Sequence, residues 1–323
     1  MKKQDLFLWM GLVLWGFLII SFPRTARAVY PEKPVTLICV WGVGGTNDSV
    51  ARTIAARMKA YFPKPVAVVN KPGGAGAIGT TEVVRATPDG YTLGSTTMTS
   101  LTIEPHRVNP PYKTPDDYTP IALVGFQAFI LNVNPDVPFK TVADFIKYAK
   151  ANPGKLRIGT FGEGHITHLI LEQLKYLAQI DLTPVPFKGG GELVAALLGK
   201  HVEGAIAGTN DVIPHARAGK LNMLGVFDEK RRNPVMEIPT FKELGYDIAM
   251  LTYTMLIGPK NLSEGVVSTF GGAYKKVSED REFRKFMEEN GYTVQYEGSE
   301  DLKKRLWKDY RENKGIFERI GKK

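Results

Sequence analysis

The chain has 323 residues, 43% of them hydrophobic, and a formal net charge of +9. Its Lys and Arg residues are scattered and not interleaved with aromatic residues, which argues against nucleic-acid binding. A single cysteine, Cys39, excludes an intrachain disulfide, and its place in an apolar run indicates an inert core thiol.

Residues 1–28 have the pattern of a secretory signal peptide. Lys2 and Lys3 precede the uncharged run Leu6–Phe22, and Ala26-Arg27-Ala28 is a small-x-small cleavage site. We expect cleavage after Ala28 and a periplasmic protein, with an uncleaved membrane anchor as the alternative because the apolar run is long. The remaining 323 − 28 = 295 residues suffice for two lobes.

Strand-like and helical patterns alternate after residue 34, as in α/β folds. The predicted strands are 35–41, 66–69, 92–96, 121–124, 128–134, 156–160, 183–187, 202–207, 221–227, 248–257 and 293–296. The predicted helices include one with an apolar stripe at Val50, Ile54 and Met58, one capped by Thr141 with Asp144, and segments 169–177, 193–198 and 302–317.

The two longest extended runs, 126–134 and 248–259, stand about 120 residues apart and enclose a self-contained βα series. We interpret both as crossings between lobes, which would form a double-stranded hinge beside a cleft. Lobe 1 would then comprise 29–127 and 253–323, and lobe 2 would comprise 128–252.

Turns that follow the predicted strands are rich in glycine and lead into helices. In open α/β sheets ligands bind beyond the carboxyl ends of strands, and helix N-termini attract anions. The turns lie at 41–48, 70–79, 160–168, 187–192 and 208–211. Their backbone N–H groups, hydroxyls and amides suit one or two carboxylates.

Other site chemistries lack their signatures. Neither glycine-rich turn of lobe 1 ends in Gly-Lys-Ser/Thr, and Asn47 occupies the third glycine position of a dinucleotide fingerprint. His165, His168 and Glu172 could share a metal, but the Glu between two His residues that metalloproteases need is missing. We therefore expect no cofactor, no metal and no catalysis, with a secreted metal-dependent hydrolase as the enzyme alternative.

The turns, taken in order, resemble those of the Bug family, the extracytoplasmic solute receptors of tripartite tricarboxylate transporters. The matching segments are Val40–Asp48 followed by Ala51-Arg52, Asn70–Gly79, Pro88–Leu93, 185–206, 218–221 and 238–245. The resemblance implies a type II periplasmic-binding-protein fold, a carboxylate-bearing ligand between the lobes, and delivery to a permease with a large and a small subunit. It also implies a receptor that is not an enzyme, and we expect a monomer.

Three residues depart from the family pattern. His165 stands where the family has Ser, Val40 replaces a Pro, and Glu163 adds an acid that an amino-acid-like ligand could pair with. His165 could anchor a carboxylate as an imidazolium, or it could remain neutral. A signalling receptor that presents its closed form to a sensor kinase is the alternative in another class.

The predicted ligand-binding residues come from both lobes. Asp48 is also expected to cap the helix that follows it, because a carboxylate would repel an anionic ligand. The full set is Trp41, Gly44, Gly45, Thr46, Asp48, Gly74 and Gly76 from lobe 1, with Gly164, His165, Thr167, Lys188, Gly189 and Asn210 from lobe 2.

Overall fold

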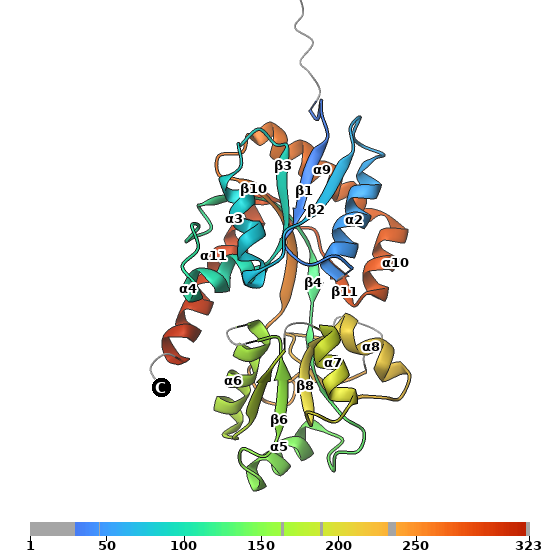
Figure 1. The fold of residues 1–323 in the computed structure, drawn as a ribbon, viewed down its shortest axis with the longest axis vertical. Coiled ribbons are helices and arrows are strands. Elements are labelled where there is room, and N and C mark those ends of the chain that lie inside the picture. The colour runs from blue at the N-terminus through green and yellow to red at the C-terminus, as the bar shows by residue number, and fades with distance from the viewer. Residues whose placement is uncertain (1–29, 45, 163–164, 188–189, 232–236, 321–323) are drawn as a thin grey trace, which may run out of the picture.

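The computed structural model describes residues 30–44, 46–162, 165–187, 190–231 and 237–320. These residues form two β-sheets with helices on both faces, one sheet in each of two lobes that lie end to end (Figure 1). The predicted alternating α/β architecture is therefore confirmed. The predicted signal peptide, 1–28, lies outside the described residues.

The sheet of lobe 1 has the order β11-β4-β10-β3-β1-β2. Strands β1, β2 and β3 pair in parallel. Strand β10 pairs antiparallel with β3 and β4, and β11 pairs antiparallel with β4. The carboxyl ends of the parallel strands face lobe 2 (Figure 1). The strands are β1 (Val35–Cys39), β2 (Val66–Asn70), β3 (Thr92–Thr97), β4 (Tyr118–Gln127), β10 (Thr252–Pro259) and β11 (Tyr292–Val294).

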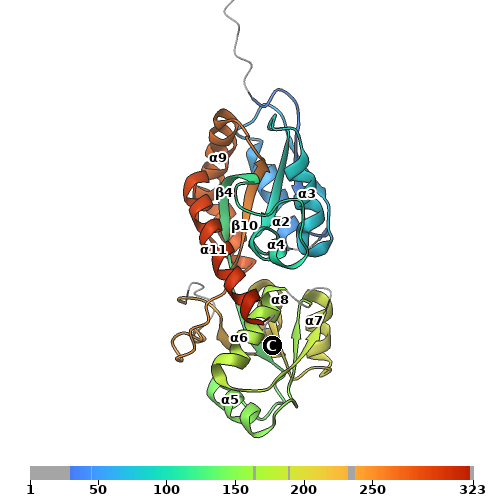
Figure 2. The same cartoon turned by 90° about the vertical axis from the view of Figure 1, so that its left-hand side faces the viewer.

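Helices cover both faces of this sheet. The predicted stripe of Val50, Ile54 and Met58 is fully buried, which fixes the inward face of α2. One apolar cluster joins the sheet to α2 (Thr46–Met58), α9 (Glu264–Glu279) and α10 (Arg281–Glu289). A second joins it to α3 (Ala77–Arg85), to the helical turn Thr99–Ile103 that precedes α4 (Glu104–Arg107), and to α11 (Ser299–Ile320). Figure 2 shows α3, α4 and α11 from the side.

The sheet of lobe 2 has the order β7-β6-β8-β5-β9. Its strands are β5 (Phe129–Val133), β6 (Arg157–Thr160), β7 (Thr183–Pro186), β8 (Gly204–Gly208) and β9 (Asn222–Val226). Helices α5 (Val142–Ala151) and α6 (Ile166–Ala178) pack on one face, and α7 (Gly190–Leu198) and α8 (Thr209–Arg217) on the other. The Thr141 side chain accepts a hydrogen bond from the Asp144 N–H, so the predicted cap of α5 is confirmed.

The chain passes between the two sheets twice. β4 ends at Gln127 in one sheet and β5 begins at Phe129 in the other. The return runs from the end of β9 to the start of β10 at Thr252. The predicted strand 248–257 was wrong in its first part, because residues 248–251 make no ladder hydrogen bonds and instead run past α11. The lobe limits at 127/128 and 252/253 stay a prediction.

In the part of the chain that the structure describes, no helix combines the length and the apolar character that crossing a bilayer requires.

Candidate functional site

The turn between β1 and α2 is held by the carboxylate of Asp48. This side chain is buried and accepts hydrogen bonds from the Gly44 N–H at 2.9 Å, from Arg52 Nε at 3.1 Å and from Asn70 Nδ2 at 2.8 Å. Burial would raise the pKa of Asp48, but these donors outweigh burial and lower it. The predicted capping position was wrong, because α2 begins at Thr46 and Asp48 is its third residue; its carboxylate instead holds the preceding turn.

The N-termini of α2 and α8 meet across the two lobes. Asn210, in the first turn of α8, donates from Nδ2 to Oγ1 of Thr46, the first residue of α2. Gln127, the last residue of β4, donates from Nε2 to Oδ1 of Asn210. Two predicted site residues, Thr46 and Asn210, are therefore in direct contact, at a place where two helix dipoles favour an anion.

A small polar network fixes the first turn of α2 from within lobe 1. The Oδ1 atom of Asn47 accepts from Thr254 Oγ1 at 2.7 Å and from the Tyr292 hydroxyl at 3.2 Å. These two donors come from β10 and β11. Neither was predicted, because nothing in the local sequence around them signals a ligand site.

Gly74 and Gly76 shape the turn before α3. Both have positive φ angles, +55° and +88°. A Cβ at Gly76 would lie only 2.1 Å from Oγ of Ser100 and 2.9 Å from Cγ2 of Val40. These glycines allow the turn to pack closely against the end of β1 within lobe 1. The structure therefore gives them a role in the packing of this turn.

His165 caps α6 from lobe 2. The Thr167 N–H donates to Nδ1 of His165 at 3.2 Å, so this ring nitrogen is an acceptor and a neutral ring carries its proton on Nε2. The ring also packs edge-on against Phe129 and Phe161, with centroids at 6.3 and 5.3 Å. Burial, helped by the positive charge of Arg107, lowers the pKa of His165 to about 3. The structure therefore favours the neutral alternative over the imidazolium anchor.

Thr167 has a supporting role in the same turn. It is fully buried, and its Oγ1 accepts from the Phe161 N–H at 2.9 Å and lies 3.1 Å from Nδ1 of His165. The hydroxyl is thus committed to the loop that carries His165.

Asp211 is an acidic side chain that the sequence did not single out. Its Oδ1 accepts from Asn210 Nδ2 at 3.0 Å, and a Cβ at Gly190 would lie 2.5 Å from that same oxygen. Burial raises the pKa of Asp211 to about 6. The starts of α7 and α8 are therefore in contact through this carboxyl group, with Gly190 leaving room for it.

Trp41 lies two residues after the end of β1, and its carbonyl accepts from Asn70 Nδ2 at 2.9 Å. Gly45, Gly164, Lys188 and Gly189 of the predicted set lie outside the described residues, as does Glu163.

The predicted metal alternative has weak geometric support. Nε2 of His168 lies 3.9 Å from Oε1 of Glu172, and that carboxylate pairs with Lys175 at 2.9 Å. Nδ1 of His165 is engaged with Thr167. Among the described residues, no group of three His, Cys, Asp or Glu side chains is placed to hold a metal ion.

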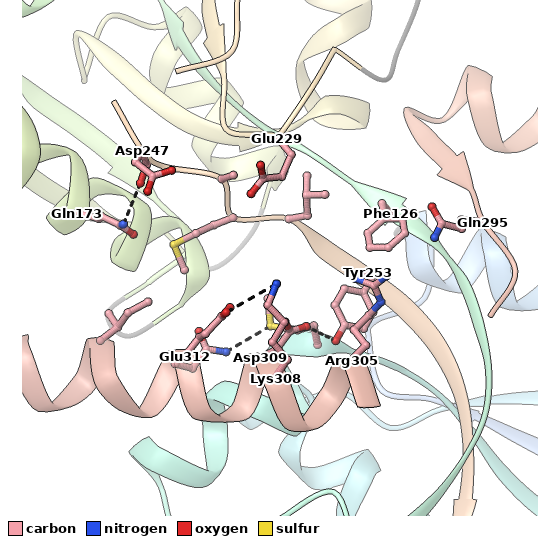
Figure 3. A pocket seen from close by; sticks show the side chains of 16 residues that line it. Phe126, Gln173, Glu229, Asp247, Tyr253, Gln295, Arg305, Lys308, Asp309 and Glu312 are labelled. Atoms are coloured by element: carbon pink, nitrogen blue, oxygen red, sulfur yellow. Dashed lines mark hydrogen bonds and ion pairs between the residues drawn. The ribbon is translucent and has the colours of Figure 1, made fainter. Parts of the chain in front are cut away.

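A pocket of about 530 Å³ lies beside the paired strands β4 and β10, on the face turned away from Asn47 and Asn210 (Figure 3). Phe126 and Tyr253 line it, whereas their neighbours Gln127 and Thr254 reach Asn210 and Asn47 on the other face. The Tyr253 hydroxyl donates to Oδ2 of Asp309 on α11 at 2.5 Å. The pocket is lined by none of the predicted site residues that the structure describes, which distinguishes it from the candidate site between the N-termini of α2 and α8.

Comparison with known proteins identifies the family. Residues 50–322 match the model of the tripartite tricarboxylate transporter family receptor. The chain belongs to this receptor family. It is 31% identical to the UPF0065 protein in the gbd 5' region of Cupriavidus necator, over 94% of this chain and 92% of that protein.

Solved structures agree with this assignment. The periplasmic binding protein BugD superposes with a TM-score of 0.80 at 28% identity, covering 90% of this chain and 99% of BugD. MatC from Rhodopseudomonas palustris, solved with bound malate, gives a TM-score of 0.79 at 24% identity, covering 89% and 99%. The resemblance seen in the glycine-rich turns is confirmed, and the chain is a solute-binding receptor with a type II periplasmic-binding-protein fold.

Proposed function

We propose that this receptor captures a small carboxylate-bearing solute in the periplasm and delivers it to a membrane permease of the tripartite tricarboxylate type. The observation that carries the proposal is the contact of Thr46 with Asn210, which brings the N-termini of α2 and α8 together. Unpaired N–H groups and helix dipoles at such ends favour a carboxylate. An amino-acid-like solute is a variant of the same class, since its carboxylate would occupy the same place.

The two lobes would close on the solute by moving relative to each other. In this proposal, residues 29–127 and 253–323 move together, 128–252 move together, and the chain bends near Ala128 and before Thr252. Opposite lobes contribute Thr46 and Asn210, so their contact forms only when the lobes are near each other. Residues 1–28 would direct export and be removed by cleavage after Ala28. Co-purification with the permease subunits, rather than with a sensor kinase, would support transport over signalling.

A carboxylate should raise the melting temperature of the purified receptor. A ligand that binds only the folded protein stabilises it by about 2.7 kcal/mol at a hundred times its Kd. A panel of malate, succinate, adipate, glutamate and neutral analogues, followed by thermal unfolding, provides the test. The neutral analogues are the control. Shifts produced by sugars or metal ions alone would contradict the proposed ligand class.

Binding should not depend on the protonation of His165 between pH 5.5 and 8. With its pKa lowered to about 3, the ring stays neutral throughout this range, which also lies above ordinary carboxylic-acid pKa values of about 4. The affinity for the carboxylate identified in the panel should therefore change with pH equally in the native protein and in His165→Asn, which retains a capping side chain. An affinity that rises at low pH only in the native protein would restore the imidazolium anchor.

A further inference from the structure

Two buried hydrogen-bonding atoms at the ends of adjacent strands have no hydrogen-bond partner among the residues that the structure describes. They are Nε1 of Trp41, just after β1, and Oγ1 of Thr97, the last residue of β3. Thr97 is 3% exposed. Leaving a buried polar group unsatisfied costs about 1–3 kcal/mol, so such atoms need an explanation.

The register of the sheet places Thr97 beside the first turn of α2. Thr97 is paired with Thr254 of β10, and residues directly opposite in antiparallel strands project from the same face of a sheet. The Thr254 hydroxyl reaches Oδ1 of Asn47, the second residue of α2. The hydroxyl of Thr97 therefore lies on the face that holds the N-terminus of α2.

The neighbouring residue in the same strand shows the contrast. Thr96 projects from the opposite face, and its hydroxyl lies 3.1 Å from that of Thr80 on α3. Thr96 is as deeply buried as Thr97, but its hydroxyl has a hydrogen-bond partner in Thr80. In the described part of the chain, three other buried atoms lack a partner, on Ser95, Tyr118 and Asn132, and they lie within strands or at the far start of β4.

We propose that Thr97 and Trp41 donate hydrogen bonds directly to a carboxylate of the solute, which sits against the N-terminus of α2. This inference rests on the proposed function and adds two lobe 1 donors to it. An indole N–H can only donate, so the group that satisfies Trp41 must be an acceptor. A carboxylate offers two acceptor oxygens, whereas an ammonium group offers none.

The proposal predicts opposite effects on stability and on binding for one substitution. Thr97→Val removes a hydroxyl without a partner, so the unliganded protein should be as stable as the native protein or more stable. The same variant should bind a carboxylate from the malate, succinate and adipate panel about 10- to 100-fold more weakly, the range expected for a lost hydrogen bond to a charged group. Thr97→Ser, which keeps the hydroxyl, should restore most of the affinity.

Thr96→Val is the matched control. It is one residue away and equally buried, and it removes the hydrogen bond between the Thr96 and Thr80 hydroxyls, so it should lower stability and leave affinity nearly unchanged. Thermal unfolding and calorimetric titration of the native protein, Thr97→Val, Thr97→Ser and Thr96→Val measure stability and affinity and so test the proposal. Native affinity in Thr97→Val would overturn this inference and leave the proposed function intact. A native protein that no carboxylate shifts would overturn both.

Discussion

Replacing Arg107 by methionine should lower the free energy of unfolding by about 2–3 kcal/mol, because the buried carboxylate of Glu104 loses its charged partner. The Arg107 side chain is itself 35% exposed. Glu104 is completely buried, and its two carboxylate oxygens accept from Nε and Nη2 of Arg107 at 2.9 and 2.7 Å. Without Arg107, that carboxylate would remain among the side chains under α11. Urea unfolding followed by circular dichroism measures the loss.

A second two-point ion pair in the chain is the matched control. Arg157 donates from Nε and Nη2 to Glu203 at 3.1 and 2.6 Å, but this pair is solvent-exposed. Exposed pairs contribute about 0–1 kcal/mol, so Arg157→Met should have a small effect. Replacing both Glu104 and Arg107 by methionine should recover much of the stability. An Arg107→Met variant no less stable than Arg157→Met would contradict the buried-pair interpretation.

Asp48→Asn should cost about 2–4 kcal/mol at pH 7, because an amide cannot replace an ionised acceptor of three hydrogen bonds. It should also weaken carboxylate binding, since the turn that leads to Thr46 loses its anchor. The pKa of Asp48 is lowered from its ordinary value of 3.8, so its contribution is complete above that value. The contribution is lost as pH falls through the lowered pKa of the folded protein.

Unfolding measured from pH 7 down to pH 2 tests this linkage. The stability difference between the native protein and Asp48→Asn should be constant above about pH 4 and should shrink below it. Asp144→Asn is the control, because Asp144 occupies the same kind of position in the first turn of α5 but is exposed. A difference that does not change with pH would mean that the charge of Asp48 contributes nothing.

The strand pattern was predictable from sequence because it depends on local composition. Each predicted run overlaps one of the strands β1 to β11, and runs of buried β-branched residues such as Val35–Cys39 explain why. The error at 248–251 arose because Ile248 is buried without belonging to a strand. Apolar composition signals burial, and it does not distinguish a sheet from a segment packed against a helix.

The candidate site could be predicted only where glycine-rich turns mark it. Thr46 and Asn210 were predicted in this way, and the structure places them in contact, while their role in ligand binding stays a prediction. Thr97 was not singled out because a Thr at the end of a strand is common. The cross-strand register shows the face on which it lies, and its hydroxyl has no partner among the described residues. The pair of Glu104 with Arg107 was missed because three-residue spacing of opposite charges usually occurs on exposed helix surfaces.

The single thiol of the chain makes lobe motion directly observable. Cys39 is fully buried at the end of β1, and burial raises the pKa of its thiol, which keeps it unreactive toward maleimide dyes. One surface cysteine introduced at Lys59, just after α2, and another at Tyr176 in α6, both exposed, could therefore be labelled without first removing the native cysteine. Single-molecule energy transfer between the two dyes would then report how the lobes open and close as solute is added.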